Sequence, residues 1–94
     1  MPFPPQTPRL FTRAGIEVLN ANQNGVYGIF REGRWIYVGR GDIRTRLLSH
    51  VTGNNPAITA QRPTHFVAMV TANDVTVERQ LIVELQPIAN QKVG

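Results

Sequence analysis

Two short runs, each with a tyrosine, a valine and a glycine, constrain the fold of this chain more than any other feature. Gly25-Val26-Tyr27 and Tyr37-Val38-Gly39 are separated by ten residues from tyrosine to tyrosine. The apolar strip between them is interrupted by polar residues around Glu32-Gly33. This pattern predicts a β-hairpin with strands over 25–31 and 34–39, because a short Gly-containing turn between two apolar runs is typical of hairpins. Rigid backbone would then hold two phenols on neighbouring strands.

The remaining elements follow from caps and periodicity. Thr12 predicts a short helix to about Ala21, and Asp42 predicts an N-cap for a helix with an apolar face. Residues 53–64 have the composition of an irregular loop, 65–70 of a third strand, and a last helix begins at Asn73 or Asp74. The order helix, hairpin, helix, strand, helix predicts the α/β class (α+β type), with a small three-stranded, mainly antiparallel sheet flanked by helices. We expect one compact domain, with residues 1–24 as an N-terminal extension and short helix, and residues 25–94 as the main domain.

Composition excludes several classes of function. The 94 residues contain no cysteine, so a disulfide framework, a thiolate zinc site and a cysteine nucleophile are excluded. No signal core and no membrane-spanning run is present, which predicts a cytoplasmic or nucleoid-associated protein without membrane contact. The net charge is +4, and nine of the ten basic residues are arginines, whose planar fork suits phosphate. A basic balance favours nucleic acid as the partner, although many small proteins are basic by chance.

Glu78 stands out among the acidic residues. At a helical period it projects between Leu81, Ile82 and Leu85, whereas Glu84 falls on the opposite, solvated side. A carboxylate on an inward face needs a partner, and a metal ion is one such partner. A carboxylate in the first turn of a helix is also stabilised by the helix dipole. Periodicity alone leaves both interpretations open.

Basic residues follow the second strand. Arg46 and His50 are four residues apart and so share one helical face, where they form either part of a phosphate site or an ordinary basic edge. The segment Gly39-Arg40-Gly41-Asp42 joins a strand to a helix start, where backbone N–H groups can meet an anion. The simpler interpretation of this segment is a tight turn, although Arg40 and Arg44 favour a phosphate contact.

Taken together, these residues resemble a GIY-YIG nuclease domain in its minimal, stand-alone form. The resemblance runs from Gly25 to Asn90, about two-thirds of the chain, and its departures from the family pattern are two isoleucine-to-valine changes. Each triplet is a weak signal by itself, whereas six positions in the family's order and spacing are a strong one. The six positions are Tyr27, Tyr37, Arg46, His50, Glu78 and Asn90.

The resemblance implies roles for these positions and one divalent cation, Mg²⁺ or Mn²⁺. Glu78 would hold the cation, with water and substrate phosphate completing its shell. Tyr27 would accept the proton of the attacking water, directly or through a water on the cation, and Tyr37 would position that water or the phosphate. Arg46 would stabilise the transition-state charge. His50 would assist proton transfer or orient the phosphate, which leaves open whether Tyr27 or His50 is the effective base.

The remaining residues would support the site and bind the substrate. Asn90 would support the site, while Gly39, Arg40, Gly41 and Arg44 would contact nucleic acid.

The sequence therefore predicts a metal-dependent DNA endonuclease that hydrolyses phosphodiester bonds. The alternative is a catalytically inactive nucleic-acid-binding module of the same fold, and a small nucleotide-binding or protein-interaction domain is a weaker third interpretation. We expect DNA binding through the phosphate backbone with modest sequence specificity, so target choice could require a homodimer or a specificity-giving protein partner. Repair, restriction, recombination, mobile-element and phage functions all use this domain, and the sequence does not choose among them.

Overall fold

A computed structural model describes residues 3–90 of the chain. Its strands are β1 (Arg9–Leu10), β2 (Asn24–Arg31), β3 (Arg34–Asp42) and β4 (His65–Val70). Its helices are α1 (Arg13–Glu17), α2 (Ile43–Val51), α3 (Pro56–Thr59), α4 (Asp74–Leu85) and the 3₁₀ helix η1 (Ile88–Asn90). None of the helices in the described part of the chain has the length and apolarity needed to cross a membrane.

The strands form one antiparallel sheet in the order β1-β4-β2-β3. The predicted hairpin is β2–β3, and it turns at Glu32 and Gly33, which have φ values of 49° and 77°. Positive φ at both central residues is the type I′ geometry that matches the twist of the flanking strands. The fold class is therefore as predicted, except that the sheet has four strands and not three.

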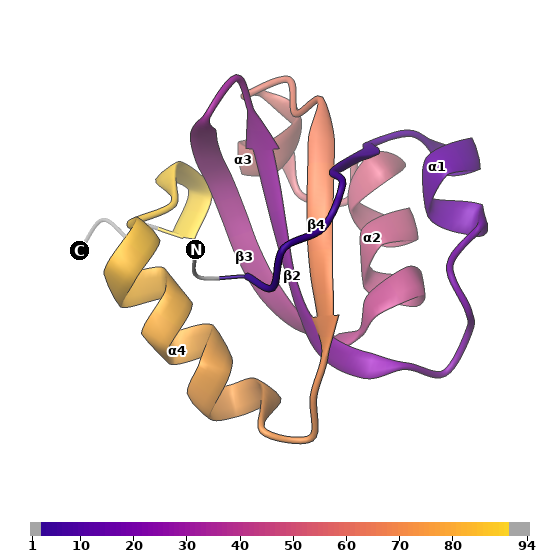
Figure 1. Cartoon of the computed structure of the whole chain (residues 1–94). Coiled ribbons are helices and arrows are strands. Elements are labelled where there is room, and N and C mark those ends of the chain that lie inside the picture. The colour runs from indigo at the N-terminus through magenta and orange to yellow at the C-terminus, as the bar shows by residue number, and fades with distance from the viewer. Residues whose placement is uncertain (1–2, 91–94) are drawn as a thin grey trace.

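Helices cover both faces of the sheet (Figure 1). On one face, Tyr27 and Ile29 of β2 pack with Ile16 of α1 and Leu47 of α2. On the other face, Val26 of β2 packs with Leu81 of α4 and with Phe3. Because both faces are covered, β2 is a continuous buried run from Gly25 to Ile29. The strand that carries Tyr27 is thus buried on both faces of the sheet.

Two predicted segments differ from the structure. The helix capped by Thr12 ends at Glu17 and does not continue to Ala21. The segment 53–64, predicted as an irregular loop, contains α3, which Asn55 caps by accepting a hydrogen bond from the Ala57 N–H. The Asn55-Pro56 pair begins this helix, since Asn favours the N-cap and Pro the first helical position.

Candidate active site

Tyr27 lies at the centre of the site, fully buried on β2. Its hydroxyl oxygen is 2.8 Å from Nε2 of His50, a residue near the end of α2. Asp42 caps α2 by accepting a hydrogen bond from the Thr45 N–H, which fixes the start of the helix directly after β3. The hairpin and the helix that follows it therefore bring the phenol and the imidazole together.

Gly39 makes room for Tyr27. The two residues are directly opposite each other in the β2–β3 pairing. A Cβ atom at position 39 would collide with the hydroxyl oxygen of Tyr27 and would lie 2.5 Å from its ring carbon Cζ. Tyr27 can therefore occupy its place in the core only because residue 39 is a glycine.

A β-bulge turns Tyr37 toward the same face. Trp35 pairs with Phe30 and Tyr37 pairs with Ile29, so Ile36 is the extra residue of the bulge. In a regular strand Trp35 and Tyr37 would share a face, whereas the bulge places them on opposite faces. The Tyr37 ring centroid lies 6.3 Å from that of Tyr27 and 5.2 Å from that of His50.

Burial and neighbouring charges shift the proton affinities of this aromatic group. Burial, together with the nearby Tyr37, raises the pKa of Tyr27, and the Arg46 guanidinium beside its hydroxyl opposes that rise. Burial and the charge of Glu78 raise the pKa of Tyr37. Burial and Arg46 lower the pKa of His50 to about 4. At neutral pH both tyrosines are therefore protonated, and His50 is neutral with one ring nitrogen free to accept a proton.

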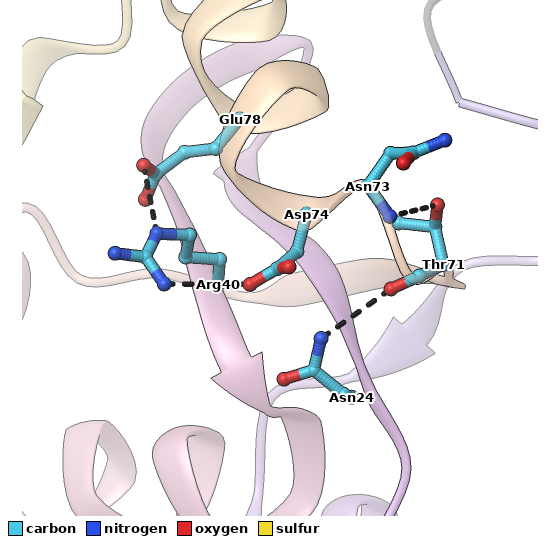
Figure 2. Close-up of polar contacts among 6 residues, drawn as sticks. All are labelled: Asn24, Arg40, Thr71, Asn73, Asp74 and Glu78. Atoms are coloured by element: carbon cyan, nitrogen blue, oxygen red, sulfur yellow. Dashed lines mark hydrogen bonds and ion pairs between the residues drawn. The ribbon is translucent and has the colours of Figure 1, made fainter.

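Glu78 lies on α4 across β3 from the aromatic group, and its carboxylate contacts Arg40 of β3 (Figure 2). The Arg40 Nε atom is 3.5 Å from Glu78 Oε1, and its Nη1 atom is 3.4 Å from Asp74 Oδ2, one helical turn earlier. Burial raises the pKa of Glu78, and Arg40 is the main opposing influence. Arg40 thus acts as the counter-ion of both carboxylates.

The entry of α4 is fixed by hydrogen bonds to the start of β2. The Thr71 hydroxyl accepts from the Asn73 N–H at 3.1 Å, and the Asn24 side chain donates to the Thr71 carbonyl at 3.4 Å (Figure 2). These contacts set where the first turn of α4 lies relative to β3. Asp74 was not recognised as a site residue from the sequence, although its position four residues before Glu78 placed both on one face.

A polar cavity of about 380 Å³ opens between Glu78, Arg40, Gly41, Arg46 and Tyr37. A second cavity of about 280 Å³ shares Tyr37 and Arg46 with it and extends past His50 to Asn55. Four of the six predicted positions, Tyr37, Arg46, His50 and Glu78, therefore border one continuous surface. Tyr27 is fully buried beneath His50 and Tyr37, whose rings it contacts.

The residues of this cavity suit a hard divalent cation. Within residues 3–90 no group of three or more histidines, aspartates or glutamates comes together. A cation here would be held by Glu78, with Asp74 one turn away and the remaining positions open to water and phosphate oxygens. Mg²⁺ prefers such sites, with one or two carboxylates and several waters, to a cage made only of protein ligands.

Asn90 lies outside this cavity. Its side-chain oxygen accepts from the Val38 N–H at 2.7 Å, and its side-chain nitrogen donates to the Val38 carbonyl at 3.0 Å. The amide thus pairs with the open edge of β3 between Tyr37 and Gly39. Asn90 therefore holds the backbone of Val38, the residue next to Tyr37, and does not line the cavity.

The start of α2 offers few free backbone donors. The Ile43 N–H donates to the Gln23 carbonyl, and the Thr45 N–H donates to Asp42. Arg44 is half-buried and borders neither cavity. The positive charge at the cavity therefore comes from Arg40 and Arg46.

No protein-family model and no curated protein matches the chain by sequence. Solved structures do match it, among them the GIY-YIG N-terminal endonuclease domain of UvrC from Thermotoga maritima bound to its catalytic divalent cation, magnesium. That match has a TM-score of 0.72 and 24% identity, and it covers 84% of this chain and 94% of that chain. A tyrosine-to-phenylalanine mutant and an asparagine-to-alanine mutant of the same domain, both bound to the cation, match at 23% and 22% identity. Each has a TM-score of 0.72 and covers 85% of this chain and 94% of its own.

Proposed function

Since the chain has the GIY-YIG endonuclease fold, we propose that it is a metal-dependent DNA endonuclease that hydrolyses phosphodiester bonds. The observation that carries this proposal is the convergence of Tyr37, Arg46, His50 and Glu78 on one continuous surface, with the Tyr27 hydroxyl behind it. The residues come from β2, β3, α2 and α4, so it is the tertiary fold that brings them together.

Glu78 is the proposed cation ligand. We assign cation binding in this chain to Glu78, because it is the one carboxylate among the described residues that line the polar cavity. When bound, the cation supplies positive charge to the scissile phosphate and makes a nearby water easier to deprotonate.

Tyr27 and His50 would handle the proton as a pair. The attacking water would form a bond to phosphorus as the bond from phosphorus to the leaving sugar oxygen breaks. The water would give its proton to the Tyr27 oxygen while the Tyr27 hydroxyl proton passes to Nε2 of His50, and the leaving oxygen would take a proton from solvent. The 2.8 Å hydrogen bond and the neutral state of His50 support this route. A general base contributes about 10²–10⁴-fold to a rate, so charge stabilisation by Arg46 and the cation would supply much of the remainder.

Nicking of supercoiled plasmid and of branched DNA in Mg²⁺ or Mn²⁺ tests the proposal. We expect Glu78→Ala to lower the rate by at least about 10²-fold and Tyr27→Phe by about 10²–10⁴-fold. Glu84→Ala is the matched control, because Glu84 is exposed on the same helix, and its rate should stay near that of the wild type. DNA binding without cleavage of any substrate would instead favour an inactive binding module. Cleavage that survives both site substitutions would refute the site assignment.

A further inference from the structure

Three arginines gather at the end of the sheet where the β2–β3 turn meets α3. Arg31 and Arg34 are directly opposite each other in the hairpin, and Arg62 follows α3. Together with Glu32 and Gln61 they line a cavity of about 290 Å³. The hairpin turn and α3 lie side by side at this end of the molecule, and the first turn of α4 lies at the other (Figure 1).

The charge of this arginine cluster (Arg31, Arg34 and Arg62) is not neutralised by the protein. Within residues 3–90 none of the three forms an ion pair, and Glu32 is the single acidic residue that lines the cavity. Like charges directly opposite on neighbouring strands destabilise a sheet. An anionic ligand bound between the two side chains would relieve this repulsion.

Backbone groups of the segment after α3 help to shape the cavity that the arginine cluster lines. The Arg31 Nη1 atom donates to the Arg62 carbonyl at 3.1 Å, which ties the segment after α3 to the hairpin. Arg62 itself has a φ of 54°, the left-handed conformation that turns the chain into β4. The side chains of Arg34 and Arg62 are exposed, so they are available to a ligand.

This cluster continues the surface of the candidate active site. The cavity beside His50 and Tyr37 reaches Asn55 and Pro56 at the start of α3, and the arginine cavity begins at Ala60 after its end. The four residues of α3 span only about 6 Å at 1.5 Å per residue. Ile36 borders one cavity and its neighbour Tyr37 the other.

We propose that the arginine cluster binds a backbone phosphate of the DNA at a distance from the scissile phosphate. The DNA would run from the Glu78 cavity past Tyr37 and α3 to the hairpin turn. The longest dimension of the molecule is 35 Å, and one turn of duplex spans about 34 Å, so one duplex reaches both places. This inference rests on the proposed function, since it assumes that the ligand of the active site is DNA.

The test compares two double variants that each remove two positive charges. Arg34→Gln with Arg62→Gln removes exposed charges of the cluster, and Arg9→Gln with Arg13→Gln removes exposed charges of β1 and α1. Fluorescence anisotropy with a 20-base-pair duplex, in EDTA and over a salt series, measures the affinity without cleavage. Melting temperatures check that both variants fold.

We expect the cluster variant to bind about 10-fold more weakly and the control variant to bind nearly as the wild type does. The slope of log K against log salt should become shallower by about 1–2 for the cluster variant, because each phosphate contact contributes about 0.9. Equal losses in the two variants, or an unchanged affinity of the cluster variant, would overturn the inference. If the cluster is instead a site for a protein or a free nucleotide, the cluster variant will bind the duplex as the wild type does, and that result counts against the inference.

The duplex-binding test of the cluster and the nicking test of the proposed function can fail independently of each other. If the wild type nicks DNA but the cluster variant binds duplex as well as the wild type, only the inference about the cluster fails. If the wild type does not nick DNA but the cluster variant loses duplex affinity, the inference holds and the catalytic proposal fails.

Discussion

At the scale of single residues, the absence of a side chain at position 39 decides where the Tyr27 hydroxyl can be. We expect Gly39→Ala to lower the free energy of unfolding by about 1–3 kcal/mol, since overpacking a closed core costs that much. The cleavage rate should fall by about 10²-fold, because a displacement of about 1 Å at a reacting group has effects of that size. Chemical denaturation and a nicking assay measure the two effects.

Gly33→Ala is the control for this substitution. Gly33 has a φ of 77°, and a Cβ atom there would meet nothing within 4 Å. The left-handed conformation makes the alanine cost about 1–2 kcal/mol of stability. Its cleavage rate should nevertheless remain that of the wild type, so a loss of cleavage in Gly33→Ala would show that instability alone accounts for the Gly39→Ala effect.

Arg40 occupies the carboxylates that a cation would use. We expect Arg40→Gln to bind Mn²⁺ about 2–5-fold more tightly in isothermal titration calorimetry, because an exposed ion pair of this kind is worth up to about 1 kcal/mol. The same variant should bind DNA more weakly, since it loses a positive charge at the cavity. Arg44→Gln is the matched control, because Arg44 has no ion pair within residues 3–90. Equal Mn²⁺ affinities of the wild type and Arg40→Gln would contradict this expectation.

At the scale of elements, side-chain amides pair with strands on both sides of the hairpin. Asn90 bonds to both backbone groups of Val38 in β3, and Gln6 bonds to both backbone groups of Ala68 in β4. Each amide takes the place of a neighbouring strand. Of these two strands only β3 carries site residues, so variants of the two amides can distinguish an effect on stability from an effect on the site.

We expect Asn90→Ala to destabilise the fold by about 1–3 kcal/mol, the cost of leaving part-buried backbone groups unpaired. Cleavage should fall as well, because Tyr37 is the residue next to Val38. Gln6→Ala should cost about 0.5–1.5 kcal/mol at an exposed position and leave cleavage unchanged. Thermal melts and nicking rates for both variants check this, and a loss of cleavage in Gln6→Ala equal to that in Asn90→Ala would refute a specific effect on Tyr37.

The elements that could be predicted from the sequence carry their own local signals. The hairpin has its Glu32-Gly33 turn, and α2 has the Asp42 cap. By contrast, β1 is two residues long and exists through its pairing with β4, which no local pattern indicates. The helix α3 has a local signal in its N-cap Asn55 and in Pro56, but an Asn-Pro pair after a helix is also typical of the loop that follows a helix end.

The candidate site was predictable in its residue types and less so in its geometry. Helical periodicity placed Glu78 inward and Glu84 outward, and the structure agrees, with Glu78 partly buried and Glu84 exposed. Strand alternation would have placed Tyr37 on the face of Trp35, and only the bulge at Ile36 moves it to the face of Tyr27. Bulges depend on the register of two strands, and one strand's sequence does not encode that register.

At the scale of the whole molecule, the helices that cover both faces of the sheet bury the His50 side chain beside the Arg46 guanidinium. The His50 side chain is 7% exposed, and its Nδ1 atom has no hydrogen-bond partner within residues 3–90. The surrounding groups are the charged Arg46 and the phenols of Tyr27 and Tyr37. This environment disfavours the imidazolium form of His50. The folded state therefore loses stability over the pH range in which His50 is protonated in the unfolded chain but still neutral in the fold.

The sign and the window of this effect follow from the pKa of His50, which falls from 6.5 in the unfolded chain to about 4 in the fold. As pH drops below 6.5, the unfolded chain binds a proton that the folded chain does not bind, so the free energy of unfolding decreases until about pH 4. The decrease amounts to at most about 3 kcal/mol. Below that window, protonation of Asp42, whose pKa is lowered by its hydrogen bonds to Thr45, removes the cap of α2 and adds a separate loss.

Urea unfolding curves of the wild type, His50→Gln and His65→Gln between pH 7 and 4 measure this dependence. Glutamine keeps a polar partner for the Tyr27 hydroxyl but does not titrate, so His50→Gln should lose most of the slope. His65→Gln, which removes the other histidine of the chain and leaves His50 in place, is the control. Glu78, whose raised pKa favours the folded state in acid, acts in the opposite direction in all three proteins and cancels in the comparison. The same slope in the wild type and His50→Gln would show that His50 is not held neutral by the fold, and it would remove the basis for a proton route from Tyr27 to His50.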